Sequence, residues 1–145
     1  MDELDYSPLL TEITNVKTAA RHKGLAKLGD EIVNMCYSVA FSLFKGAPTG
    51  DKVSAIVLSE ALKQNSMRDL ARSRAEQHDI ADAAEALIAY AYLIRKLSVD
   101  EMIDAILEGL KTGIRNPVNQ KEKRETDIKG CSNLMKIIRE ILIDY

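Results

Sequence analysis

The sequence predicts an all-α protein, and three observations carry that prediction. Apolar residues recur at the i, i+3, i+4 spacing of a helix along most of the 145 residues. No stretch of useful length alternates apolar and polar residues, as a half-buried strand would. Capping residues, glycine and proline separate the periodic segments into about six to seven helices. With 46% hydrophobic residues, the chain can bury one core, so we expect residues 1–145 to form a single domain.

The first half of the chain divides into four expected helices. Ser7 followed by Pro8 is typical of a helix start, and the first helix then carries Leu9, Ile13, Val16 and Ala20 on one stripe. The second runs roughly over 25–45 and ends at the Gly- and Pro-containing loop 46–50. A third is expected over 51–64 and a shorter one over 66–76. The expected buried stripe of the second helix is Leu28, Ile32, Cys36, Val39 and Leu43.

The second half contains three more segments. A helix is expected from about Asp79 to Lys96, and Ser98-Val-Asp-Glu101 is a capping box that begins the next, which Gly113 ends. Residues 114–130 are polar and rich in both charge signs, which indicates a mobile connection. The last helix is the most regular. Its stripe is Leu134, Ile137, Ile138, Ile141, Leu142 and Tyr145.

Composition excludes several classes of protein. The net charge of −2 creates no overall field that would attract nucleic acid, so any basic surface must be local. Cys36 and Cys131 lie far apart, which argues against a zinc site or disulfide framework and fits a reducing compartment. The longest uncharged apolar run, 86–94, is shorter than the roughly 20 residues that span a bilayer. We therefore expect a cytoplasmic protein with no membrane association; we assign His22 and His78 to its surface.

Three carboxylates occupy unexpected places in apolar helices. Asp30 lies between the apolar positions Leu28 and Ile32, and Asp82 and Glu85 share one helical face among small apolar residues. On two packed helices they would form an oxygen-rich pocket suited to Mg²⁺, which can assist phosphate hydrolysis. The alternatives are structural. Asp30 would cap a helix, Asp82 would lie in the first turn of its helix, where the helix dipole favours acids, and Glu85 would pair with a lysine. Composition and spacing alone favour those structural roles.

Two segments carry a resemblance that changes this balance. Residues 25–30, LAKLGD, resemble the first signature of the ribonuclease III family, and residues 82–93, DAAEALIAYAYL, resemble the second. Residues 50–59 are similar to the helix between them. The resemblance covers 24–97 and is closest to the mini-ribonuclease III type, which lacks a double-stranded RNA-binding domain; we expect no separate RNA-binding domain here.

The resemblance implies a homodimeric, all-helical endoribonuclease. Such an enzyme cuts double-stranded or stem-loop RNA with Mg²⁺, for which Mn²⁺ can substitute, and leaves 5′-phosphate ends. Asp30, Asp82 and Glu85 match three acidic positions of the family, which makes them the expected catalytic and metal-binding residues. Cations should contact the RNA phosphates. The better candidates are Lys23 and Lys27 beside the acids; Arg68 and Arg72 lie in a second basic region that also contains acids, for which the favoured alternative is an ordinary solvated face.

The sequence also departs from the family pattern. Ala26 stands where the family has a glutamate four residues before the signature aspartate, Lys23 replaces a second acid, and Lys27 replaces an aromatic residue. One alternative is therefore a non-catalytic dimeric relative that binds structured RNA or a protein partner. Another is an unrelated helical bundle, which predicts that Asp30 and Glu85 lie far apart.

Overall fold

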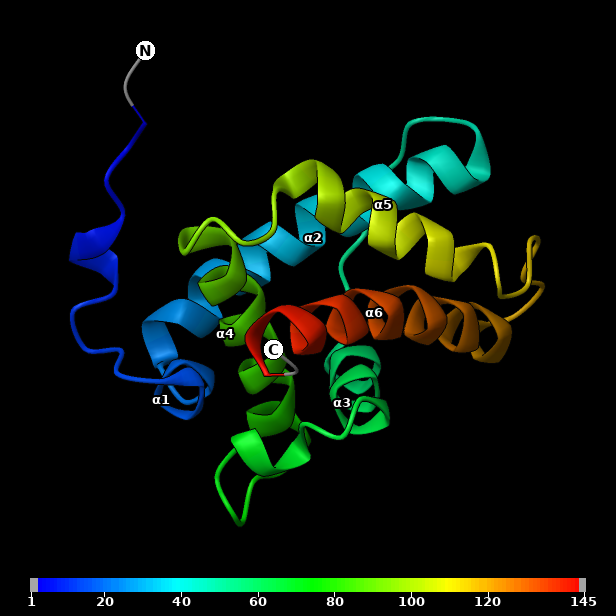
Figure 1. The fold of residues 1–145 in the computed structure, drawn as a ribbon. Helices are drawn as coiled ribbons and strands as arrows, with labels where there is room; N and C mark the ends of the chain where they lie inside the picture. The colour runs from blue at the N-terminus through cyan, green and yellow to red at the C-terminus, as the bar shows by residue number, and fades with distance from the viewer. Residues whose placement is uncertain (1–2, 144–145) are drawn as a thin grey trace.

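A computed structural model describes residues 3–143 and shows helices, with no strand, over this range (Figure 1). The all-α prediction is confirmed. Six α-helices and two 3₁₀ turns follow one another in the described residues. They are η1 (Ser7–Leu9), α1 (Val16–Ala20), α2 (Lys23–Lys45), α3 (Ala55–Gln64), η2 (Arg68–Leu70), α4 (Gln77–Leu93), α5 (Val99–Leu110) and α6 (Gln120–Leu142).

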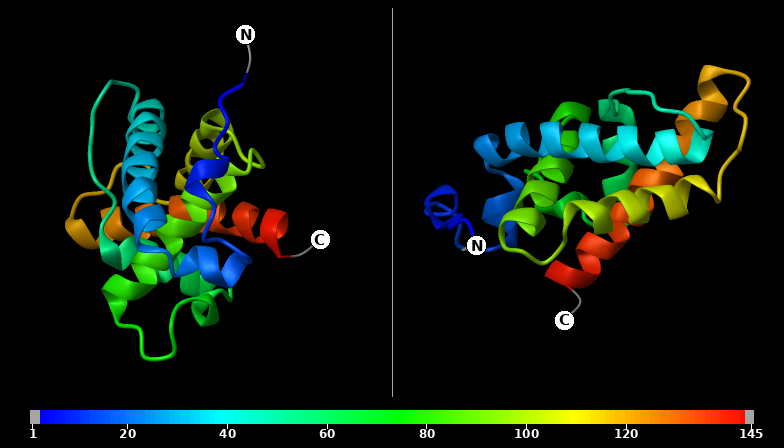
Figure 2. Two further views of the ribbon diagram at one scale, coloured as in Figure 1. Left: turned by 90° about the vertical axis from the view of Figure 1, so that its left-hand side faces the viewer. Right: turned by 90° about the horizontal axis from the view of Figure 1, so that it is seen from above.

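Helix α4 lies at the centre of the arrangement. It packs against α2 on one side and against α3 and α6 on others, while α5 packs against α2 and α6. The views in Figure 2 show α2 running along one face and the N-terminal segment lying outside the helical body. Apart from Asp82, every residue of α4 from Ile80 to Ala89 is buried, because the helix is covered on several sides. None of the described helices is long and apolar enough to cross a membrane.

The expected single helix at the amino end is wrong. A 3₁₀ turn at Ser7–Leu9 is followed by an irregular stretch, and α1 begins only after Asn15. The Asn15 side chain accepts a hydrogen bond from the Thr18 backbone N–H, so this residue is an N-cap that restarts the helix. The apolar spacing that suggested one helix instead brings Tyr6, Leu10 and Ile13 onto a small cluster at the end of α4.

The predicted buried stripe of α2 is also largely wrong. Cys36 is buried as expected, but Leu28, Val39 and Leu43 are exposed. The buried face is shifted around the helix to a set that includes small residues. It comprises Leu25, Ala26, Gly29, Val33, Cys36, Tyr37, Ala40 and Phe44. Small residues allow close packing against α4, so shape, rather than hydrophobicity alone, decides which face is buried.

The predicted mobile connection over 114–130 is wrong in its second half, because α6 begins at Gln120. The Asn119 side chain caps it by accepting from the Glu122 N–H, and Thr126 and Gly130 pack against the end of α5. The last helix buries Leu134 and Ile138 as expected; Tyr145 lies outside the described residues.

The shorter elements differ in their ends. The expected helix over 66–76 is reduced to η2, and Ser54 caps α3, which therefore begins at Ala55. The Ser98–Glu101 capping box of α5 is confirmed. His22, expected at the surface, is half-buried: its Nδ1 accepts from the Leu25 N–H and so caps α2.

Candidate active site

A glycine sets the distance between the two helices that carry the acids. At Gly29 of α2, an added Cβ would lie 1.8 Å from the Glu85 carbonyl oxygen of α4. No side chain fits there, so the α2 and α4 backbones touch at this crossing. Asp30 follows Gly29 directly, and the crossing therefore brings it beside Glu85.

The three predicted acids, called the acid cluster below, meet at this crossing. Asp30 lies inside α2, and Asp82 and Glu85 lie inside α4. Glu85 is buried, with 8% of its surface exposed, and lies within hydrogen-bonding reach of both aspartates. The alternative of an unrelated bundle, which predicts Asp30 and Glu85 far apart, is wrong.

The structural roles considered for these acids do not fit the geometry either. Asp30 is not a cap, because α2 begins at Lys23. Asp79, rather than Asp82, occupies the first turn of α4 and completes its capping box. Glu85 pairs with no cation within the described residues.

Burial and the crowding of like charges change the protonation of Glu85. Burial, together with the hydrogen bond and charge of Asp30 and the nearby charge of Asp82, raises the pKa of Glu85 to about 9. Glu85 therefore holds a proton at neutral pH in the protein alone. A buried carboxyl that faces two half-buried carboxylates, with the exposed Lys23 ammonium 3.9 Å from one of them, forms a site that favours added positive charge.

The acids open into a pocket of about 430 Å³. Two of the predicted RNA contacts, Lys23 and Lys27, line it together with the acid cluster. Its other wall comes from the α2–α3 loop and the start of α3. The remaining lining residues are Ala26, Val53, Ala55, Leu58, His78 and Ala81.

Sequence reasoning missed two residues of this site. Asn34 donates from Nδ2 to the Asp30 carboxylate at 3.0 Å, and its Oδ1 accepts from the Val53 N–H at 2.8 Å. It thereby fixes Asp30 and ties it to the opposite wall. His78 is exposed as expected but lines the pocket. The i, i+4 spacing of both from an acid was the available signal.

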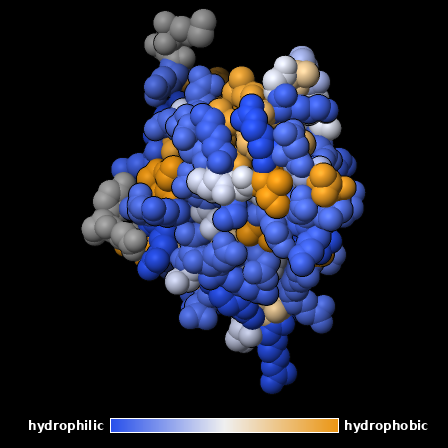
Figure 3. Space-filling view, turned by 90° about the vertical axis from the view of Figure 1, so that its right-hand side faces the viewer, coloured by the Kyte–Doolittle hydropathy of each residue, from blue (hydrophilic) through white to orange (hydrophobic). Residues whose placement is uncertain are grey.

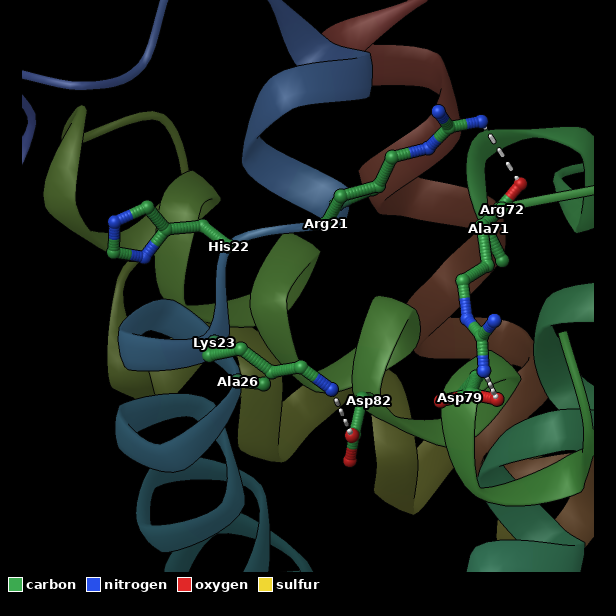
Figure 4. Close-up of a pocket in the computed structure, with 9 residues that line it drawn as sticks. Arg21, His22, Lys23, Ala26, Ala71, Arg72, Asp79 and Asp82 are labelled. Atoms are coloured by element: carbon green, nitrogen blue, oxygen red, sulfur yellow. Dashed lines mark hydrogen bonds and ion pairs between the residues drawn. The ribbon is translucent and has the colours of Figure 1, made fainter.

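A smaller hollow of about 130 Å³ adjoins the pocket at Ala26 (Figure 4). The two share Lys23, Ala26 and Asp82. In Figure 4, Lys23 reaches from the start of α2 toward Asp82, and the ammonium lies 3.9 Å from the carboxylate. Alanine at position 26 thus leaves space beside the acids.

The two arginines predicted to contact RNA lie farther from the acids. The Arg72 guanidinium lines the smaller hollow and pairs with Asp79 at 2.6 Å. Arg68 lines neither space; it donates to the carbonyls of Arg72, Ser73 and Ala75 and so holds the loop before α4.

The donor set suits a hard divalent cation. In the described part of the chain, no three His, Cys, Asp or Glu side chains are arranged to hold a metal by themselves. Mg²⁺ does not need such a cage, because it commonly takes one or two carboxylates and completes its shell with water and substrate phosphate. The open pocket and its crowded carboxyls are consistent with that mode of binding.

The two segments that resemble ribonuclease III signatures, residues 25–30 and 82–93, lie in α2 and α4 and meet where these helices cross. The family model described as Ribonuclease III matches residues 23–143, so the chain belongs to the ribonuclease III family. This is a nuclease family whose members generally use divalent metal ions. The match extends from α2 through α6, beyond the 24–97 range expected from the motifs. A comparison with curated proteins found no match.

Proposed function

We propose that this protein is an endoribonuclease that cleaves double-stranded or stem-loop RNA by Mg²⁺-dependent hydrolysis and leaves 5′-phosphate ends. The observation that carries the proposal is the meeting of Asp30, Asp82 and Glu85 in one open pocket, where burial and the neighbouring aspartates raise the pKa of Glu85. Family membership supports RNA as the substrate. We treat residues 1–145 as one catalytic domain.

Each residue of the pocket has a distinct proposed role. Asp30 and Asp82, with Glu85 once it has lost its proton, would hold Mg²⁺; Mn²⁺ can take its place. The ion would activate a water and stabilise charge on the phosphate. Asn34 keeps Asp30 oriented. Lys23 and Lys27 stand at the pocket edge, where their ammonium groups can contact the RNA backbone.

A cleavage assay tests the proposal. A labelled RNA duplex is incubated with Mg²⁺ and the wild type, Glu85→Gln or Lys63→Gln. We expect cleavage to fall at least about 100-fold in Glu85→Gln, because the site loses an anionic ligand. Lys63, which pairs with Glu60 away from the pocket, should be replaceable without effect. Equal cleavage by wild type and Glu85→Gln, or none by either, would contradict the catalytic role.

Ala26 favours a second function, that of a non-catalytic relative that binds structured RNA or a protein. The side chain at position 26 lines the adjoining hollow and supplies no carboxylate there. The two functions differ in metal binding. A Mn²⁺ titration by calorimetry should show binding that Asp82→Asn weakens if the site is catalytic. RNA binding without Mn²⁺ binding would favour the second function.

We further propose that the protein is a homodimer and that α2 supplies the interface. Exposed apolar side chains follow one stripe of α2 at helical spacing. They are Leu28, Met35, Val39 and Leu43, with the partly buried Ile32 between them. The face shown in Figure 3 has separate apolar spots on a mostly hydrophilic surface.

Sedimentation equilibrium tests the interface. Met35→Glu should place charge in the apolar stripe and shift a dimer to monomer. The control is Val118→Glu, at an exposed apolar residue in the α5–α6 connection, which should remain dimeric. A wild-type monomer at micromolar concentration would refute the dimer.

A further inference from the structure

The Lys23 side chain is not explained by the stability of the helix that carries it. Lys23 is the first residue of α2, where the helix dipole favours anions and disfavours a cation. Its ion pair with Asp82 is long, at 3.9 Å, and its side chain is 78% exposed. Exposed pairs of this kind contribute little to folding.

The position of Lys23 relative to the site is distinctive. Lys23 lines both the acid pocket and the adjoining hollow. It also lies close enough to Asp79 for its charge to act on that carboxylate, although Asp79 is already paired with Arg72. Lys27 lines the acid pocket too, but forms no ion pair with a described carboxylate. Lys23 is therefore the described cation paired directly with the acid cluster.

A divalent cation and the Lys23 ammonium cannot both lie close to Asp82 without repulsion. A cation bound there would displace the ammonium, whose exposed and flexible stem can then reach an RNA phosphate. Conversely, a phosphate that attracts the ammonium leaves the Asp82 carboxylate without this counter-ion, so the carboxylate attracts a divalent cation more strongly. Two ligands that each favour the release of the same contact bind cooperatively, by thermodynamic linkage.

We propose that Lys23 is a movable counter-ion of this site, paired with Asp82 in the free protein and with an RNA phosphate when RNA is bound, an exchange that a divalent cation at the acid cluster favours. The proposal rests on the proposed function, since it assumes that the acid cluster binds the cation. It assigns Lys23 two opposite effects: it weakens metal binding in the absence of RNA and strengthens RNA binding.

Calorimetric titration of the RNA-free protein with Mn²⁺ tests the first effect. Lys23→Gln removes a like charge next to the site and should bind Mn²⁺ about three- to tenfold more tightly at low ionic strength. Lys23→Arg keeps the charge and should match the wild type. The matched control is Lys63→Gln, which removes a lysine paired at 3.8 Å with Glu60 and should also match the wild type.

Fluorescence anisotropy with a labelled RNA duplex in EDTA tests the second effect. Lys23→Gln should bind the duplex several-fold more weakly than Lys63→Gln, because it loses a phosphate contact. Circular dichroism checks that both variants are folded.

The outcomes separate the two proposals. Wild-type Mn²⁺ binding that Asp82→Asn weakens, but that is unchanged or weaker in Lys23→Gln, overturns the counter-ion role alone. Tighter Mn²⁺ binding with unchanged RNA affinity overturns the phosphate contact. Absence of Mn²⁺ binding in every variant overturns the proposed function and the counter-ion role together.

Discussion

Two clusters of charged groups lie along α2 and are built in opposite ways. The acid cluster at the α4 crossing gathers carboxyls of one sign. Farther along α2 lies a second group, called the lysine cluster below, which consists of Lys123 of α6 and its partners. The Lys123 ammonium lies 2.9 Å from Asp127 and 3.1 Å from Asp51. Tyr37 of α2 donates to Asp127 and accepts from Lys123. The second cluster contains close counter-charges, whereas the described cation paired with the first is the exposed Lys23, at 3.9 Å from Asp82.

The pKa values follow this difference. In the lysine cluster, burial opposes the Lys123 charge, but the hydrogen bonds and charges of Asp127 and Asp51 raise its pKa overall. Burial and the Asp127 carboxylate raise the pKa of the Tyr37 hydroxyl. Both shifts keep the cluster in its neutralised form. In the acid cluster, the raised pKa of Glu85 reflects burial and repulsion. A cluster whose charges are neutralised by its own members stabilises the contact between helices, whereas a cluster with an excess of one charge sign can bind a ligand of the opposite sign.

The largest expected effect comes from the contact that forms the acid cluster. Gly29→Ala places a methyl group against the Glu85 carbonyl and must separate α2 from α4, at a cost of about 3 kcal/mol or more. Urea denaturation measures it. Gly24→Ala, on the same helix, meets only the His22 side chain and should change stability by less than about 1 kcal/mol. Similar stabilities of the two variants would contradict the close crossing.

Removing one acid should have opposite effects in the two clusters. In EDTA at pH 8, Glu85→Gln should stabilise the protein by about 3 kcal/mol, because it removes the cost of keeping the carboxyl protonated. Asp127→Asn should destabilise it by about 2 kcal/mol, because the Lys123 ammonium loses its nearest partner. Thermal and urea unfolding of both variants measure the signs. Two changes of the same sign would refute the comparison.

The acid cluster should also make stability depend on pH. The pKa of Glu85 is about 9 in the folded protein and has an ordinary value of 4.5. The folded state therefore binds the extra proton, and this contribution is complete below pH 4.5 and lost as pH rises toward 9. In EDTA, the unfolding free energy of the wild type should fall by about 1 kcal/mol per pH unit between pH 5 and 9.

Glu85→Gln provides the control for this pH dependence. Its unfolding free energy, measured in urea at the same pH values, should change less steeply than that of the wild type. Parallel slopes for the two proteins would assign the dependence to other groups.

The smallest expected effect concerns one hydroxyl of the lysine cluster. Tyr37→Phe removes the hydrogen bonds to Asp127 and Lys123 while the ion pairs remain, and should cost about 1 kcal/mol. Chemical denaturation measures the loss. Cleavage of duplex RNA by Tyr37→Phe should equal that of the wild type, since Tyr37 does not line the acid pocket. Reduced cleavage by the folded variant would show that the lysine cluster affects the acid pocket and would contradict its purely structural role.

Local patterns determined much of this protein. Helical spacing predicted the all-α class, the capping box predicted the start of α5, and the i, i+3 spacing predicted that Asp82 and Glu85 share a face. These features depend on residues within one or two turns, so the sequence is sufficient. The meeting of Asp30 with Glu85 needed the family resemblance as well, because it joins residues far apart in the chain.

Only the tertiary structure decided which surfaces meet. Hydrophobic spacing placed Leu28 and Val39 in the core, whereas the close approach at Gly29 turned the face that carries this glycine inward. The charges around Lys123 suggested a loop, but partners from α2 and the 46–54 connection allow a helix there. The acid cluster also gained Asn34, His78 and the Lys23 pair. Such outcomes depend on the free energy of contacts between distant segments, which local periodicity does not contain.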